Sequence, residues 1–278
     1  MSRSTPKAPW RSRFEEHIPV TGNPLLSLAT VSRHSHGNAF PRVRTCVLRG
    51  FFAGLDLHPD ARRDMKSASG LAGGPGLEES GKDDDDASYL NPRKYESDLL
   101  TITTDVRSEK VGHIMTDVDG EWRLKGKAYI IGGDSSDRME LKAREEIEKS
   151  MRLRGEGDTS TSGTGSDRPW SWETEITTHF ANLSPGTFMQ DLPGAPKSGP
   201  ASTPQEAPGG GKAVSDLHEP MARKNFRVVV IKPEEVEYIH DEGTGNSKNE
   251  RFRWELVSSD SSTGGDGQWH WKEEELWP

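Results

Sequence analysis

The sequence predicts a mainly β protein with a few helices, whose strands form a closed or nearly closed antiparallel barrel. Several segments of five to twelve residues are rich in β-branched and aromatic side chains. In some of these segments the apolar positions alternate, and Gly-rich loops separate the last segments at hairpin-like spacing. Only 31% of the 278 residues are hydrophobic, and 29 are Gly and 18 are Pro, so we expect a core smaller than the length suggests.

The overall composition argues against several classes of protein. A net charge of −9 provides no basic field for nucleic-acid phosphates. No stretch approaches the ~20 apolar residues of a membrane helix, and we expect no membrane partner. Cys46 is the only cysteine, which excludes an internal disulfide and a Cys-rich zinc site and is consistent with a reducing compartment. We therefore expect a cytoplasmic protein.

The N-terminal third contains a short helix and two strands. Trp10, Phe14 and His17 have helical spacing, which predicts an amphipathic helix over 10–17. A first strand is expected over 25–32 and a second over 40–52.

The second strand places Arg44 on the same face as Cys46 and Leu48, while Val43, Thr45 and Val47 lie on the other face. A buried guanidinium needs an anionic partner, because an unpaired buried charge is costly. A protein carboxylate and a ligand fit this requirement equally well. Cys46 is interpreted as a small buried hydrophobic residue.

The stretch 99–110 changes from β-branched and apolar to charged within a few residues, which predicts a strand running into the start of a helix. Asp105 can cap the following turn, and Arg107, Ser108 and Lys110 bring two cations and a hydroxyl to the same end. Such a group can bind a phosphate. The alternative is a capped turn followed by a solvated basic helix face.

The remaining elements follow from similar patterns. Gly126 interrupts a strand over 122–132 and predicts a bulge or bend. Helices are expected over 134–154 and 170–183. A strand that turns at Pro233 is expected over 226–239, and a final hairpin pairs 249–256 with 269–272.

We expect one domain over 8–278, interrupted by three flexible insertions at about 58–93, 155–168 and 192–220, which are rich in Gly, Ser, Pro or like charges. The acidic run at 83–86 and the pair His34 and His36 are interpreted as solvated loops, because no complete set of metal ligands accompanies them. No metal site is predicted.

Several of these segments, in this order, carry a resemblance to a known family. They are PRVRTCVLRG, LLTITTDVRSEK, EWRLKGKA, an LSP turn followed by PG, FRVVVIKPEEVEY, NERFRW and a terminal Trp-Pro. Together they resemble the pyridoxamine 5′-phosphate oxidase-like family of FMN-binding split β-barrels. The first two segments form the most specific pair.

The resemblance implies FMN as cofactor, bound at the interface of a homodimer, with the flavin carrying the redox chemistry. The second strand would line the flavin ring through Thr45, Cys46, Val47 and Leu48, and Arg44 and Arg49 would approach the ring and its phosphate. The rest of the phosphate and ribityl site would be Thr103, Thr104, Arg107, Ser108 and Lys110. Arg251 matches an arginine that the family places near the flavin.

The sequence also departs from the family pattern. Ser247 and Asn249 stand where the oxidase has the arginine and histidine that hold its vitamin B6 substrate. Glu121 replaces a glutamine near the flavin, and its charge disfavours an anionic reduced flavin. The interval between Lys110 and Trp122 is too short for the family's helix and whole barrel strand, so either one barrel strand is missing or a segment has been lost.

Two functions follow from these observations. The first is a flavin-dependent oxidoreductase that acts on an unidentified small molecule. The second is a non-catalytic FMN-binding protein, or a degenerate split barrel that serves as an interaction module.

Overall fold

The computed structural model describes residues 5–18, 24–33, 39–69, 88–105, 115–118, 122–133, 135–154, 168–183, 216–240, 249–259 and 269–277. The helices are α1 (Arg11–His17), α2 (Pro59–Ala68), α3 (Arg138–Glu148), α4 (Trp172–Ala181) and α5 (Pro220–Asn225). The strands are β1 (Leu25–Arg33), β2 (Ala39–Phe51), β3 (Tyr95–Glu96), β4 (Leu100–Asp105), β5 (Met115–Val118), β6 (Trp122–Ile131), β7 (Arg152–Leu153), β8 (Phe226–His240), β9 (Glu250–Ser258) and β10 (Trp269–Glu275).

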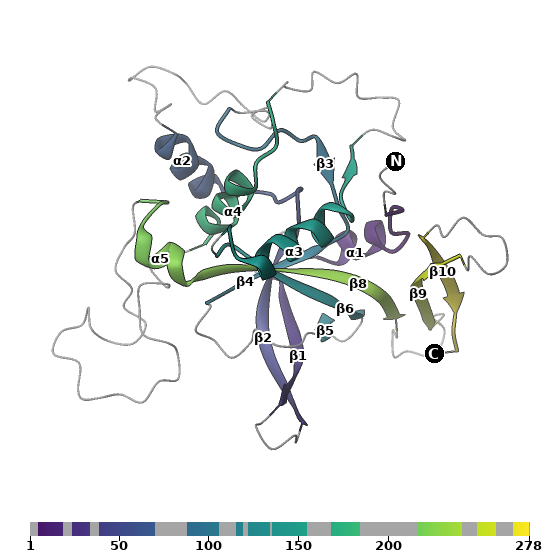
Figure 1. Cartoon of the computed structure of the whole chain (residues 1–278). Helices are drawn as coiled ribbons and strands as arrows, with labels where there is room; N and C mark the ends of the chain where they lie inside the picture. Colours follow the sequence, from purple (N-terminus) through teal and green to yellow (C-terminus); the bar gives the residue numbers. More distant parts are fainter. Residues whose placement is uncertain are drawn as a thin grey trace.

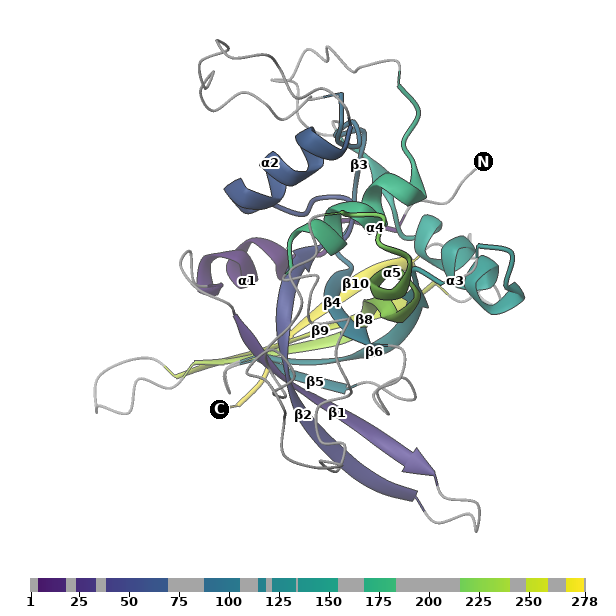
Figure 2. The same ribbon diagram turned by 90° about the vertical axis from the view of Figure 1, so that its left-hand side faces the viewer.

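One curved antiparallel sheet forms the centre of the molecule (Figures 1 and 2). Its strand order is β10-β9-β8-β4-β2-β1-β5-β6, and β6 also pairs with β8, so the order returns to β8. Along one edge of β8, the N-terminal half pairs with β4 and the C-terminal half with β9. This arrangement confirms the predicted mainly β, antiparallel class and is consistent with a split barrel.

The sheet separates two hydrophobic cores. Since successive side chains of a strand point to opposite faces, one set fills the inside of the curved sheet and the other meets the helices. The inner core contains Trp10 and Phe14 of the α1 region together with Leu48, Ile102 and Trp122. The outer core lies between the sheet and the helices α2 to α5, which Figure 1 shows on one side of the sheet.

Gly126 marks a shift of register in the β6–β8 ladder, which confirms the predicted bulge. A methyl group at Gly126 would lie 2.0 Å from the carbonyl oxygen of Lys232, so only glycine allows this close approach. The predicted turn at Pro233 is wrong. β8 continues through Pro233, which lies opposite Gly126 at the register shift, where a strand tolerates the missing N–H.

Two expectations for the loops are corrected. Within the insertion expected at 58–93, residues 59–68 form α2, which buries Ala61 and Met65 in the outer core. This helix is short, and its amphipathic pattern runs directly into a Gly-rich segment, which hides it in the sequence. The interval before Trp122 contains β5, a strand of four residues that bridges β1 and β6, so a short strand occupies the place where a missing one was considered.

The predicted helices at the N-terminus, after β6 and before residue 183 are confirmed as α1, α3 and α4. The final hairpin is confirmed as β9 paired with β10. His34, His36 and the acidic run at 83–86 lie outside the described residues. None of the helices in the described ranges is both long and apolar enough to cross a membrane.

Candidate functional site

The clearest part of the expected phosphate site is a contact between β2 and β4. The guanidinium Nε of Arg49 donates a hydrogen bond to Thr103 Oγ1 at 3.2 Å. Burial lowers the pKa of Arg49 from its ordinary value. In the described part of the chain, no carboxylate lies within 4 Å of this guanidinium. Arg49 therefore offers a half-buried positive charge beside a hydroxyl, which suits a phosphate oxygen.

A bulge in β2 places Arg49 in this position. Leu48 pairs with Ile102 of β4, and the register then shifts before Gly50, which has a φ of 135°. Beyond the bulge, Phe51 enters the inner core and Phe52 the outer core. A glycine is needed here because an L side chain rarely adopts this backbone conformation.

The face of the sheet that carries Arg49 is apolar and open toward the β1–β2 hairpin. Val43 pairs with Ala29, and Leu25 pairs with Val47, so these side chains share one face. Leu25, Val31 and Val43 are 49%, 38% and 68% exposed. An exposed apolar sheet face beside a cation is a surface that a ligand or another protein can cover.

Helix α4 covers the same face near Arg49. His179 of α4 is fully buried, and its ring stacks on Phe52 at 6.0 Å between centroids. Burial lowers the pKa of His179, the nearby Glu175 carboxylate raises it, and the charge of Arg49 lowers it further. The stacking of His179 on Phe52 places α4 against the end of β2, close enough for the charge of Arg49 to act on His179.

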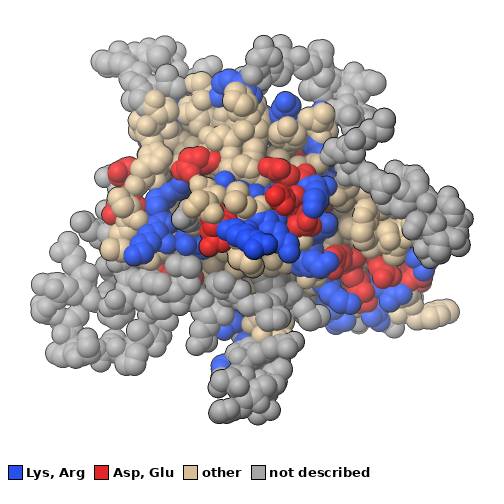
Figure 3. Space-filling model, in the orientation of Figure 1, with Lys and Arg blue, Asp and Glu red and all other residues tan. Residues whose placement is uncertain are grey.

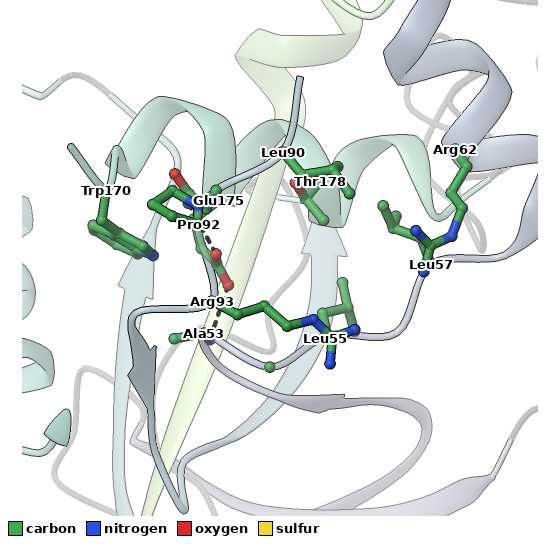
Figure 4. A pocket seen from close by; sticks show the side chains of 12 residues that line it. Ala53, Leu55, Leu57, Arg62, Leu90, Pro92, Arg93, Trp170, Glu175 and Thr178 are labelled. Atoms are coloured by element: carbon green, nitrogen blue, oxygen red, sulfur yellow. Dashed lines mark hydrogen bonds between the residues drawn. The ribbon is translucent and has the colours of Figure 1, made fainter. Parts of the chain in front are cut away.

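A small cavity lies beside this neighbourhood, between α4 and the segment after β2 (Figure 4). Glu175 lines it and accepts hydrogen bonds from the backbone N–H of Ala53 at 2.9 Å and from Asn91 Nδ2 at 3.2 Å. Its volume is about 50 Å³, which is enough for water molecules and far too small for a flavin. This cavity cannot hold a flavin.

Arg44 does not join Arg49. It lies on the inner face of β2, where Nη1 donates a hydrogen bond to Thr30 Oγ1 at 2.9 Å. Cys46 and Leu48 share this face and are buried in the inner core, which confirms the interpretation of Cys46. The side chains of Cys46 and Leu48 are therefore closed to a ligand, and these two residues can contact a flavin only through their backbone.

The other predicted site residues are distributed as follows. Thr104 is buried, and its hydroxyl donates a weak hydrogen bond to the carbonyl oxygen of Asp105 at 3.4 Å. Thr45 and Val47 lie on the outer face with Arg49. Four predicted residues lie outside the described residues: Arg107, Ser108, Lys110 and Glu121. The helix expected after Asp105 lies in the same gap.

Arg251 lies far along the sheet from Thr103. Arg251 pairs with Ile239, whereas Thr103 pairs with Val228, so the two positions are separated by eleven residues of β8, or roughly 35 Å of strand. The guanidinium of Arg251 forms an ion pair with Glu237 at 3.1 Å. Arg251 and Thr103 therefore lie beside opposite ends of β8.

Comparison with known families identifies the fold. A protein-family model, described as pyridoxamine 5′-phosphate oxidase, FMN-binding domain, matches residues 7–158 of the sequence. The match covers more than half of the chain. The chain belongs to the pyridoxamine 5′-phosphate oxidase FMN-binding family. A search of curated proteins found no match.

The family match covers α1 to β7 and includes both strands of the Arg49–Thr103 contact. It does not cover α4, α5 or β8 to β10, so Arg251 is assigned by the motif alone. The described part of this FMN-binding domain fits a phosphate group at Arg49 and Thr103.

The sequence analysis did not single out the basic residues Arg223, Lys224 and Arg227, which line a second cavity. Three cations within five residues where a buried strand begins were a detectable signal.

Proposed function

We propose that this chain is a flavin-dependent oxidoreductase that binds FMN between two copies of itself and acts on a small molecule. When bound, FMN supplies the electron or hydride transfer. The protein's own residues bind and orient the cofactor: Arg49, Thr103 and the segment 104–110 hold its phosphate and ribityl chain, and the backbone of 45–48 lies along the ring. The proposal includes a cytoplasmic location, for which the support is the lone, buried and unbridged Cys46.

One observation carries the proposal. In a chain with a net charge of −9, the half-buried guanidinium of Arg49 has a hydroxyl and no carboxylate as partner among the described residues. A structural arginine with this degree of burial usually has an anionic partner, because its desolvation is otherwise costly. The phosphate of FMN would provide that partner.

The need for two copies follows from the position of Arg251. Since Arg251 and Thr103 are far apart along β8, a site that uses both residues takes Arg251 from the second copy. The exposed apolar side chains Leu25, Val31 and Val43 lie on the face that carries Arg49 and offer a surface for that copy.

The first experiment is an absorbance spectrum of the purified full-length chain, with FMN added if the protein is colourless. We expect flavin absorbance that is bleached by a reductant such as NAD(P)H. Colourless protein that cannot be reconstituted with FMN would overturn the proposal.

The second experiment removes the two cations of the motif after β4. The double variant Arg107→Ala, Lys110→Ala should lose FMN on gel filtration, because Arg49 alone would remain of the three cations proposed to hold the phosphate. Unchanged flavin content would contradict the assignment. A matched control is Lys66→Ala, which removes an exposed cation from α2 and should retain the flavin.

A second function is favoured by the departures from the family pattern. Ser247 and Asn249 cannot replace the arginine and histidine that hold the substrate of the oxidase, because neither carries a positive charge. The alternative is therefore an FMN-binding or degenerate split barrel without catalysis. Flavin that remains bound but resists reduction by donors would favour it.

A further inference from the structure

A second cavity lies between the end of β6, the start of β8, and the helices α4 and α5. Its volume is about 540 Å³, within the range of sites for small molecules. Arg223 and Lys224 of α5, Arg227 of β8 and Arg144 of α3 line it, together with the backbone of Gly132 and Gly133. Figure 3 shows basic side chains gathered across the middle of the face seen in Figure 1.

The charge in this cavity is opposite to that of the whole chain. Four cations line it, whereas Glu173 is the one carboxylate among the described lining residues. A second carboxylate, Glu140, is buried beneath it, where it pairs with Arg144 and accepts hydrogen bonds from the backbone N–H groups of Gly132 at 3.2 Å and Gly133 at 2.7 Å. The charge of Asp105 also acts on Arg227, so three carboxylates oppose four cations in a protein of net charge −9.

The cations keep unused donors. Arg223 forms an ion pair with Glu173 through Nη2, while its Nη1 is buried and has no hydrogen-bond partner in the described part of the chain. Such a buried donor calls for an explanation, because buried polar groups are almost always hydrogen-bonded. Lys224 is exposed and has no carboxylate within 4 Å among the residues described.

Arg227 is held rigidly at the wall of the cavity. Its Nη1 donates hydrogen bonds to the carbonyl oxygens of Phe226 at 2.6 Å and Lys224 at 2.9 Å. The carboxylates of Glu140 and Asp105 act on its guanidinium, but within the described ranges neither forms an ion pair with it at 4 Å or less. A fixed guanidinium beside a second arginine and a lysine is an arrangement that suits a doubly charged tetrahedral anion.

We propose that this cavity binds the phosphate group of a phosphorylated small molecule through Arg223, Lys224 and Arg227. All three residues lie outside the stretch that matches the FMN-binding family, and the inference does not depend on flavin binding at β2 and β4. The phosphate has two sources, either a separate phosphate monoester or the tail of FMN itself.

The test uses isothermal titration calorimetry of the full-length chain at constant ionic strength, with glycerol phosphate, FMN and riboflavin as probes. The variant carries Arg223→Gln and Lys224→Gln, and Lys66→Gln is the matched control on α2. We expect the double variant to weaken phosphate binding by roughly tenfold or more, since it loses two charge-assisted contacts, and the control to bind as the wild type does. Lys224→Gln alone, at an exposed residue, provides the same test with a smaller loss if the double variant does not fold.

The comparison of FMN with riboflavin identifies which molecule supplies the phosphate group. Weaker binding of FMN but not of riboflavin in the double variant assigns the cavity to the FMN tail, whereas weaker binding of glycerol phosphate alone assigns it to a second molecule. The inference is overturned if the wild type and the double variant bind both phosphates equally, or if the wild type binds neither. A chain that binds glycerol phosphate and no flavin would retain this inference and reject the flavin proposal.

Discussion

At the scale of single residues, Gly126 and His179 each lie in tight contact with neighbouring groups. Gly126 is placed where β6 approaches the backbone of β8, and the nearest obstacle is the carbonyl oxygen of Lys232. His179 is enclosed by Phe52, Glu175 and the outer core, without access to solvent. Both residues test the packing of the fold, and His179 also lies within reach of the charge of Arg49.

Gly126→Ala should destabilise the fold by about 1–3 kcal/mol, because the added methyl group would meet a backbone atom that cannot move aside. Urea denaturation measures the change. Gly54→Ala is the control, since its methyl group would have only Arg154 Nη2 at 3.7 Å and the Phe51 carbonyl at 3.9 Å as close neighbours. Equal stabilities of the two variants would contradict the tight β6–β8 crossing.

His179 should make the fold less stable in mild acid. Burial lowers the pKa of His179 in the folded chain, so below the unfolded value of about 6.5 the unfolded chain binds a proton that the folded chain does not. The contribution is complete above that pH and declines by at most about 1.4 kcal/mol per pH unit as the pH falls. The Glu175 carboxylate, 4.0 Å from His179 Nδ1, opposes this shift, and Arg49 supports it.

The measurement is the urea midpoint at pH 7.5 and pH 5.5. The wild type should lose more stability between these values than His179→Gln, which has no group to titrate. His58→Gln, at an exposed histidine, should behave as the wild type does. A wild type that gains stability in acid would show that Glu175 outweighs burial.

At the scale of elements, hydrogen bonds and ion pairs of Asp98 connect segments whose contact the pattern of apolar residues does not predict. Asp98, just before β4, accepts hydrogen bonds from the backbone N–H of Ala8 at 2.9 Å and from Arg11 Nη1 at 3.2 Å. It also receives two from Arg152 of β7, at 2.6 and 2.9 Å. A single carboxylate thus connects the N-terminal segment, β4 and β7.

Asp98→Asn should cost about 3 kcal/mol in the free energy of unfolding, because it leaves two largely buried guanidinium groups with less compensation. Removing an exposed ion pair is the matched control. Lys127→Gln breaks the contact with Glu234 at 2.7 Å and should cost less than about 1 kcal/mol. Similar losses in the two variants would mean that the Asp98 network contributes no more than a surface pair.

At the scale of the whole molecule, the exposed apolar face of the β1–β2 hairpin offers a surface for dimer formation. The face lies beside Arg49, and in the proposed dimer Arg251 of the second copy completes the flavin site. Dimer formation and flavin retention should therefore be lost together.

Val43→Lys should convert a dimer into a monomer, because it places a charge at a 68% exposed position of that face. Light scattering coupled to gel filtration measures the mass, and absorbance of the same peak measures the flavin. Met139→Lys, at a 76% exposed residue of α3, should leave both unchanged. A Val43 variant that stays dimeric would place the interface elsewhere.

The sequence alone determined the longer strands β1, β2, β4, β6, β8, β9 and β10, the helices α1, α3 and α4, the bulge at Gly126 and the two faces of β2. These features could be predicted because apolar periodicity and glycine position are local properties. It missed α2, whose short apolar face merges into a Gly-rich run, and also the short helix α5 and the four-residue strand β5. Only the tertiary structure decided which face of β2 is enclosed. Strand pairing places Arg44 inside and Arg49 outside, and it separates Arg251 from Thr103 along β8. The physical reason is that alternation fixes which side chains share a face, whereas partner strands and covering helices determine what each face meets.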